Sequence, residues 1–258
     1  AMRGFGAILR LQSGEEFMDK YHPMRSLAPR DVVARAIYRE MTRRGEDFVY
    51  LDVTHKDPDA VRSHFPNIYE KCLSIGIDIT KDWIPVTPAA HYCCGGVKVD
   101  TNGETSIKRL YALGETSCTG LHGANRLASN SLIEAVVYAD QAARHASSLL
   151  DRVEIQEGIP DWDFEGTQHT EEMLMLIQSK REVQQIMSNY VGIVRSNLSL
   201  KRAMRRLSIL FEETEELYGK TKPNRELCEL RNMIAVAYLV IKQGREIKES
   251  VGCHYNAD

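Results

Sequence analysis

The stretch HGANRLASNSLIEA, residues 122–135, lies where a loop of small residues gives way to a helix. Within it, Ser131 and Glu134 have the Ser-x-x-Glu spacing of a capping box. In a capping box the serine oxygen accepts a hydrogen bond from an unpaired backbone N–H, and the glutamate reaches back to the backbone of the capping residue. The spacing therefore predicts a helix that starts at Ser131 and runs to about Leu150.

The loop before this helix has features that a cap does not explain. Gly120 and Gly123 let the backbone approach a ligand closely. His122 and Arg126 place two side chains that can be cationic near the positive end of the helix dipole. The loop therefore predicts a binding site for an anion, or for a ring that becomes negative during a reaction.

The composition excludes several classes of protein. Hydrophobic residues make up 43% and charged residues 27% of the 258 residues, which is typical of a folded globular protein, and the net charge of −3 gives no reason to expect a nucleic-acid partner. The longest apolar run, Met233 to Ile241, has nine residues, whereas a bilayer span needs roughly 20. Six cysteines form no Cys-x-x-Cys pattern, which favours a reducing, cytoplasmic compartment and predicts no metal site.

Residues 1–90 are expected to form one domain of mixed strands and helices. A strand is predicted at 5–11, where apolar residues alternate weakly before a turn. A second strand is predicted at 46–54, in the sequence EDFVYLDVT. Short strands between helical stretches indicate a domain of the α+β class.

Two helical regions are predicted between and after these strands. Pro29 starts the first, whose apolar residues recur at every fourth position, and Gly45 ends it. The second covers 58–76 and is interrupted by Pro66, because proline cannot continue the hydrogen bonding of a helix.

Residues 91–150 are expected to form a different unit. The segments 95–100 and 105–113 predict a hairpin, because Asn102 and Gly103 between them tolerate the positive φ of a tight turn. The chain then passes from a strand end through the glycine-containing loop into a helix. Folds with alternating strands and helices commonly bind ligands at such a junction.

The remainder of the chain is predicted to be a linker followed by a helical domain. Residues 151–167 are rich in Gly, Pro and Asp and indicate a linker. Three long helical patterns follow, which together predict an antiparallel three-helix bundle domain over 168–258. The patterns cover about 168–191, 196–219 and 225–249. A structural role is expected for the bundle.

Several strings together resemble one known family. IPVTPAAHYCCGG (84–96) and HGANRLASNSL (122–132) are similar to the flavoproteins of the succinate dehydrogenase and fumarate reductase superfamily. APRDVVARAI (28–37) and LDVTH (51–55) are similar to the L-aspartate oxidase branch of it. The resemblance implies an α+β fold with three parts: a capping domain, the C-terminal part of an FAD-binding domain, and a helical bundle.

The resemblance implies three residues that act on the substrate. Arg30 matches the arginine that donates or accepts a proton at the substrate carbon in this superfamily. His91 and Arg126 match the histidine and the arginine that hold substrate carboxylates. These roles suit a dicarboxylate such as aspartate, since an arginine fork binds a carboxylate through two hydrogen bonds.

The resemblance also implies a set of contacts with FAD. Glu115 matches the acidic residue that binds the sugar-alcohol part of the cofactor. Asn130, Ser131 and Leu132 match the helix start that lies against the flavin ring. The positive end of a helix dipole would stabilise negative charge that develops on that ring.

The implied reaction is the oxidation of L-aspartate to iminoaspartate, with oxygen or fumarate as the electron acceptor. In the family this reaction is the first step of quinolinate and NAD biosynthesis, and quinolinate synthase is a possible partner. Two alternatives remain open from the sequence. One is a flavoprotein of fumarate reductase or succinate dehydrogenase, and the other is a non-catalytic module in which the helical bundle mediates interactions.

Two features of the sequence depart from the family pattern. The Gly-x-Gly-x-x-Gly fingerprint of the dinucleotide-binding half is absent, so we expect a C-terminal fragment that neither retains FAD nor catalyses the reaction alone. Near the C-terminus, Val251 stands where the family usually has an arginine. A contact made by that arginine is therefore not expected here.

Overall fold

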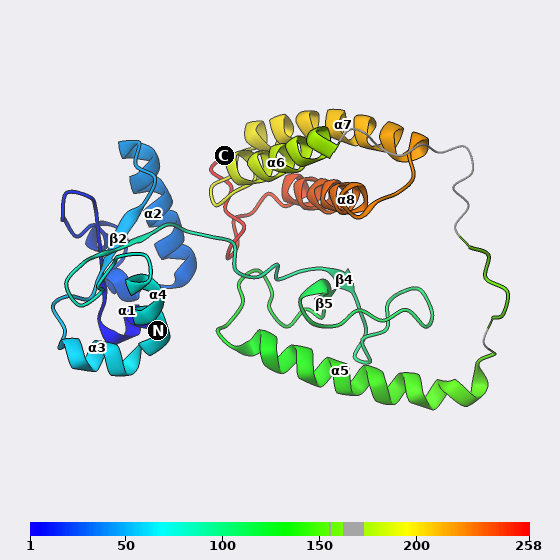
Figure 1. Ribbon diagram of the computed structural model, residues 1–258, viewed down its shortest axis with the longest axis horizontal. Helices are drawn as coiled ribbons and strands as arrows, with labels where there is room; N and C mark the ends of the chain where they lie inside the picture. Colours follow the sequence, from blue (N-terminus) through cyan, green and yellow to red (C-terminus); the bar gives the residue numbers. More distant parts are fainter. Residues whose placement is uncertain (155, 162–172) are drawn as a thin grey trace. The chain divides into compact units, whose positions relative to one another are not determined.

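The computed structural model describes residues 1–154, 156–161 and 173–258 (Figure 1). The chain forms two compact units, Ala1–His91 and Tyr92–Asp258. Residues 155 and 162–167 of the predicted linker and the predicted helix start at 168 lie outside the described residues.

A three-stranded antiparallel sheet forms the centre of the first unit. The strands pair in the order β1-β2-β3. They are β1 (Ile8–Arg10), β2 (Val49–Asp52) and β3 (Ile84–Val86). The strands predicted within 5–11 and 46–54 are confirmed, whereas β3 was not predicted from the sequence.

The two predicted helical regions of the first unit form, although the second ends at Leu73 and not at 76. The helix α2 (Arg30–Arg44) ends at Gly45, which adopts a left-handed φ of 69°. The stretch that contains Pro66 divides into α3 (Pro58–His64) and α4 (Pro66–Leu73). Three short elements complete the unit: α1 (Met2–Phe5), η1 (Met18–Lys20) and η2 (Arg25–Leu27).

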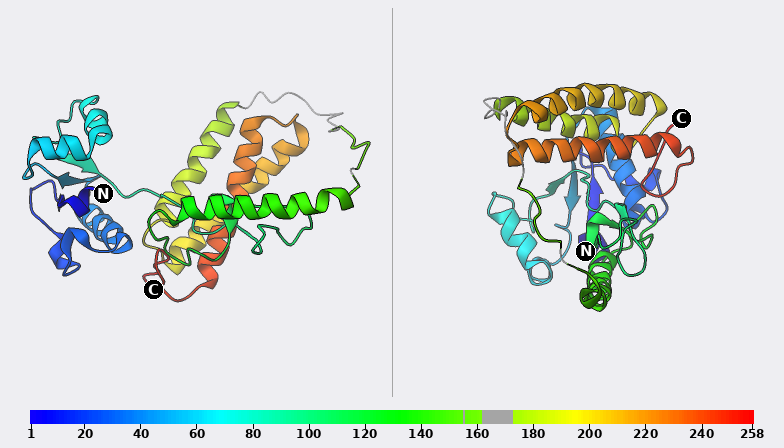
Figure 2. Two further views of the ribbon diagram at one scale, coloured as in Figure 1. Left: turned by 90° about the horizontal axis from the view of Figure 1, so that it is seen from below. Right: turned by 90° about the vertical axis from the view of Figure 1, so that its right-hand side faces the viewer.

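Two apolar clusters stabilise the first unit. One joins α2 to the sheet through residues such as Val33 and Leu9, and the other joins α3 to the sheet through residues such as Val61 and Val53. Leu51 of β2 packs against both clusters. Figure 2 shows α2 and α3 on opposite sides of the sheet.

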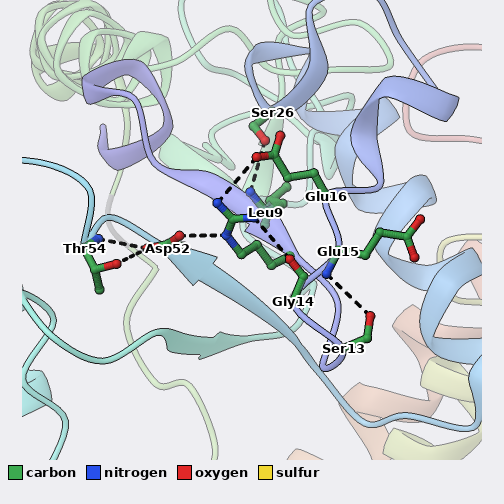
Figure 3. A network of polar contacts seen from close by, with 9 residues as sticks. Leu9, Ser13, Gly14, Glu15, Glu16, Ser26, Asp52 and Thr54 are labelled. Atoms are coloured by element: carbon green, nitrogen blue, oxygen red, sulfur yellow. Dashed lines mark hydrogen bonds and ion pairs between the residues drawn. The ribbon is translucent and has the colours of Figure 1, made fainter.

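A partly buried ion pair connects the outer strand β1 to β2 (Figure 3). Arg10 donates from Nε to Asp52 Oδ2 at 2.7 Å and from Nη1 to the carbonyl oxygen of Gly14 at 3.1 Å. Asp52 also accepts from the backbone N–H and the hydroxyl of Thr54. Burial alone would raise the pKa of Asp52, but these hydrogen bonds outweigh it and hold the pKa below its usual range.

The second unit begins with a parallel pair of strands, β4 (Val97–Lys98) and β5 (Ser117–Cys118). The predicted hairpin over 95–113 is therefore wrong. Its turn does form, because Gly103 has a φ of 75° and donates to the carbonyl oxygen of Asp100.

Two backbone features explain why the hairpin does not form. Arg109 has a φ of 68°, which interrupts the predicted second strand. Gly96 lies so close to Thr116 that a Cβ there would stand 2.1 Å from its carbonyl oxygen. Only glycine permits this approach, which brings Val97–Lys98 beside β5 instead.

The long helices of the second unit agree with the prediction to within three residues at every end that lies in the described residues. The helix α5 (Asn130–Leu149) lies between η3 (Gly114–Thr116) and η4 (Leu150–Arg152). A bundle follows, in which three helices share one apolar core and short connections reverse the chain direction. Its helices are α6 (Met173–Tyr190), α7 (Asn197–Lys220) and α8 (Arg225–Glu246).

We predict that Asp52→Asn destabilises the first unit by about 2 kcal/mol at neutral pH, because the Arg10 charge loses its buried partner. Since the pKa of Asp52 is lowered in the folded state, this stability is present above a pH of about 4 and is lost as the pH falls through the lowered pKa. Hydrogen exchange of the β1 and β2 amides measures the effect. Asp59→Asn is the control, because its side chain is 89% exposed and its pair with Arg62 should contribute little.

We also predict that Leu230→Ala destabilises the bundle by about 3 kcal/mol, because it leaves a cavity in the core. Leu230 is 1% exposed, whereas Leu239 on the same helix is 52% exposed. Leu239→Ala should therefore cost less than about 1 kcal/mol. Urea denaturation followed by circular dichroism compares the two variants, and equal losses would contradict the assigned core.

Candidate functional site

The start of α5 differs from the predicted capping box. The residue before the helix, Ser129, has a left-handed φ of 69° and makes no side-chain cap bond. Ser131 accepts instead from Nη1 of Arg126 at 3.1 Å. Glu134 bonds to three side chains from other segments. The capping-box prediction is therefore wrong, because tertiary partners replace the local backbone ones.

The Glu134 side chain is 2% exposed and lies at the centre of a polar cluster. It accepts from the Tyr92 hydroxyl at 3.2 Å and from Nε2 of His122 at 2.7 Å, both at Oε2. The Thr119 hydroxyl donates to Oε1. An ionised carboxylate only accepts hydrogen bonds, so three donors satisfy this buried group. We call Tyr92, Thr119, His122 and Glu134 the Glu134 cluster.

The bond to Glu134 determines which nitrogen of His122 carries the proton. A carboxylate accepts, so Nε2 must be the donor. The His122 side chain is 5% exposed, and in the part of the chain that the structure describes its Nδ1 is buried without a hydrogen-bond partner. The hydrogen bond from Nε2 to Glu134 therefore connects the His122 ring to α5.

Arg126 packs against the ring of Tyr92, a member of the Glu134 cluster. Its guanidinium carbon is 5.1 Å from the centre of the Tyr92 ring, within the range of a cation–π interaction. The His122 ring meets the Tyr92 ring edge to face, with their centres 5.1 Å apart. Burial, followed by the charge of Glu134, raises the pKa of Tyr92, so its hydroxyl remains a donor at neutral pH.

The predicted FAD-binding residues lie near this cluster. Glu115 is in η3 and accepts from the backbone N–H of Cys93 at 2.9 Å. Its charge also contributes to the raised pKa of Tyr92. Asn130 and Leu132 lie in the first turn of α5, and Leu132 is exposed.

Arg30 and His91 belong to the first unit. Arg30 is the first residue of α2 and is exposed. Burial, with a contribution from the charge of Arg30, lowers the pKa of the neighbouring Arg3. His91 is exposed in the segment after β3. Of the predicted site residues, Glu115, Arg126 and Ser131 therefore lie near one another, all in the second unit. Arg30 and His91 belong to the other unit.

The C-terminal segment contacts the loop that carries Arg126. The backbone N–H of Cys253 donates to the carbonyl oxygen of Ala124 at 2.9 Å. Gly252 has a φ of 55°, and a Cβ there would stand 2.6 Å from the same oxygen. Val251 is half exposed. The segment therefore reaches the loop through Gly252 and Cys253.

Arg195, in the connection between α6 and α7, anchors this C-terminal segment. Its guanidinium is mostly buried, and Nη1 lies 3.0 Å from Nδ1 of His254. Its backbone N–H donates to Tyr255, and its carbonyl oxygen accepts from Ala257. The helical bundle is thereby connected to the loop before α5.

The sequence did not reveal most of the Glu134 cluster. Tyr92 and Thr119 were not singled out, and Glu134 was assigned to a cap. The only local signal was that Tyr92 follows His91 directly, and His122 precedes Arg126 within one loop. Nothing in the spacing shows that Glu134 bonds to side chains 12 to 42 residues away.

The residues present fit one side of an anionic or flavin-like ligand. The first turn of α5 has no side-chain cap and therefore presents the positive end of its dipole. Exposed Leu132 adds an apolar contact in the same turn. Within the described ranges, no group of three His, Cys, Asp or Glu side chains could hold a metal ion, and no helix is long and apolar enough to cross a membrane.

The chain is similar along its whole length to L-aspartate oxidases. It is 49% identical to that of Pseudomonas aeruginosa and 47% identical to that of Vibrio cholerae, covering 100% of this chain and 48% of each relative. The chloroplastic L-aspartate oxidase of Oryza sativa is 44% identical, with 42% of its length covered. The chain therefore spans about half the length of the curated relatives it matches.

Solved structures show the same fold. A chain of quinol–fumarate reductase with menaquinol molecules matches with a TM-score of 0.82 and 29% identity, over 99% of this chain and 50% of that one. A chain of Escherichia coli quinol fumarate reductase matches with a TM-score of 0.81 and 28% identity, over 99% and 49%. The α+β fold predicted from the resemblance is therefore confirmed.

Two family models match the chain. The model described as the fumarate reductase flavoprotein C-terminal region matches residues 180–258, which include most of the bundle. The model described as the FAD binding domain matches residues 1–132, just over half of the chain. The chain belongs to this FAD-binding family of flavoproteins.

Proposed function

We propose that the complete protein is an FAD-dependent L-aspartate oxidase. It oxidises L-aspartate to iminoaspartate, and oxygen or fumarate accepts the electrons. The observation that carries this proposal is the identity of 42% to 49% with L-aspartate oxidases over the entire chain. Because the chain spans about half of those relatives, the proposed activity belongs to the complete protein, and we expect the chain alone to be inactive.

Arg126 and His91 are proposed to bind the two carboxylates of aspartate. The planar guanidinium of Arg126 is already oriented by Ser131 and by the Tyr92 ring. Little rotational freedom is then lost when it binds a carboxylate through two hydrogen bonds. His91 is exposed and can donate from either ring nitrogen when it is protonated.

Arg30 is proposed to transfer a proton at the substrate carbon. An arginine has a pKa above about 12, so this role requires nearby positive charge that disfavours its protonated form. Arg3 is a neighbouring cation in the first unit, and burial followed by the charge of Arg30 lowers the pKa of Arg3. If Arg30 instead stabilises negative charge electrostatically, its replacement lowers turnover without altering the pH profile of the reaction.

Glu115 and the start of α5 are proposed to hold FAD. The Glu115 carboxylate would accept hydrogen bonds from the sugar-alcohol hydroxyls, and Asn130, Ser131 and Leu132 would lie against the ring. FAD, when bound, accepts the hydride that leaves the α-carbon of aspartate. The helix dipole of α5 would then place positive potential beside the ring.

The product places the protein at the first step of quinolinate and NAD biosynthesis. Quinolinate synthase is the proposed partner, because it would consume the iminoaspartate. The bacterial relatives favour a cytoplasmic location, although relatives from Oryza sativa and Nicotiana tabacum are named chloroplastic.

We predict that Arg126→Leu in the complete protein lowers kcat/KM for aspartate at least about 100-fold and leaves FAD bound. The loss corresponds to two charge-assisted hydrogen bonds to a carboxylate. Peroxide formation and flavin absorbance measure the two effects. Arg144→Leu is the control, because Arg144 is an exposed arginine on α5, the helix that follows the Arg126 loop, and is paired with Asp140. Near-normal turnover of Arg126→Leu would contradict the assignment.

We also predict that aspartate, and not succinate, reduces the flavin of the complete protein. The alternative function, a flavoprotein of succinate dehydrogenase or fumarate reductase, predicts the reverse. Anaerobic bleaching of the flavin absorbance after each substrate is added distinguishes them. In parallel, the 258-residue chain should purify without stoichiometric flavin. A yellow complex of this chain would contradict the expectation that it does not retain FAD.

A further inference from the structure

The Glu134 cluster contains a buried carboxylate that the proposed reaction does not use. Taking a carboxylate out of water costs several kcal/mol unless hydrogen bonds replace its hydration. Here the replacement comes from Tyr92 and from Thr119 and His122, which lie at the two ends of the loop 119–122. An apolar residue at this position would avoid the free-energy cost of desolvating a carboxylate. Stability alone therefore does not explain why Glu134 is buried here.

The Glu134 cluster holds in place the Tyr92 ring against which the Arg126 guanidinium packs. Glu134 fixes the hydroxyl of Tyr92, and the Tyr92 ring lies under Arg126. His122, held by the same carboxylate, packs edge to face against that ring. The ring is therefore held at its hydroxyl and against a neighbouring ring, and it cannot rotate away from Arg126 without breaking a buried hydrogen bond.

A second set of contacts makes Arg126 depend on the same helix turn. Ser131, which accepts from Arg126, lies three residues before Glu134 on α5. Residues three apart lie on the same face of a helix. The Thr119 and His122 bonds hold both ends of the loop 119–122 against this turn. α5 thus holds Arg126 through two contacts: the bond from Arg126 to Ser131, and the Tyr92 ring that Glu134 holds in place.

We propose that Glu134 is a positioning residue for Arg126, acting through Tyr92 and His122. This inference rests on the proposed role of Arg126 in binding a substrate carboxylate. Loss of the Glu134 carboxylate releases Tyr92 and His122, so that Arg126 samples orientations that do not match a carboxylate. Binding of a dicarboxylate then weakens, although no residue that touches it has changed.

The test measures the dissociation constant of malonate, a dicarboxylate, for the complete FAD-loaded protein by calorimetry, together with KM and kcat for aspartate. Glu134→Gln keeps the size of the side chain but places an NH₂ group against one of three donors. We expect the Kd of malonate and the KM of aspartate to rise about tenfold, with a smaller decrease in kcat.

A double-mutant cycle separates positioning from general destabilisation. If Glu134 acts through Arg126, the variant Arg126→Leu/Glu134→Gln binds malonate no more weakly than Arg126→Leu alone. Additive losses would overturn the proposal. Tyr92→Phe removes one bond to the carboxylate and retains the ring, so it should raise the Kd a few-fold, without adding to Glu134→Gln. It provides the same test should Glu134→Gln not fold.

Glu40→Gln is the matched control. The Glu40 side chain is also 2% exposed and accepts from the Tyr21 hydroxyl at 2.7 Å and from Arg44 at 3.0 Å, in the first unit. It should lower thermal stability and leave the Kd of malonate unchanged. An equal weakening of malonate binding in both variants would show that loss of any buried carboxylate suffices, and would overturn the proposal.

The outcomes distinguish this inference from the proposed function. If the unmodified protein binds malonate through Arg126 but does not oxidise aspartate, the proposed function fails and the cycle still tests Glu134. If it oxidises aspartate and Glu134→Gln has unchanged KM and Kd, the positioning role alone fails. If Arg126→Leu binds malonate normally, the role of Arg126 in carboxylate binding and the positioning role of Glu134 are both overturned, whereas oxidation of aspartate still tests the proposed function.

Discussion

The burial of one carboxylate constrains the whole region around the start of α5. Glu134 can be buried only if donors surround it, and those donors come from the start of the second unit, from the residue after β5 and from the loop before α5. The start of the second unit and the loop 119–122 must therefore both converge on one turn of α5. The free energy of apolar contacts varies gradually with distance, whereas an unsatisfied buried charge costs much free energy. The need for donors around Glu134 therefore allows only a narrow set of backbone arrangements.

Sequence reasoning succeeded where local residues determine the structure. Gly45 ends α2 because its left-handed conformation suits glycine, and Pro66 separates α3 from α4 because it cannot continue a helix. The three helices of the bundle follow from long amphipathic patterns. In each case the structure is determined by residues that are close together in the sequence, so the sequence pattern is sufficient to predict it.

Sequence reasoning failed where residues far apart in the sequence make the contacts that a local pattern assigns to neighbouring residues. The segments around Asn102 and Gly103 have the residues of a hairpin, but Gly96 allows a closer approach to Thr116 and a parallel pairing with β5. Ser131 and Glu134 have the spacing of a capping box, but Arg126 and the cluster donors bond to them instead. The roles of Arg30, His91 and Glu115 came from family resemblance, since no spacing pattern links residues so far apart in the chain.

The contact of Gly252 and Cys253 with Ala124 has a consequence for how the protein assembles. Cys253 lies 128 residues after Asn125, which its sulfur also contacts, and the entire helical bundle intervenes. Contacts between such distant residues form late, because the chain between them must first become compact. During synthesis on the ribosome, the loop that carries Arg126 emerges well before its C-terminal partner exists. The contacts of this loop with Gly252 and Cys253 can form only after the bundle has been synthesised, so we expect the proposed substrate site to be completed late in the maturation of the protein.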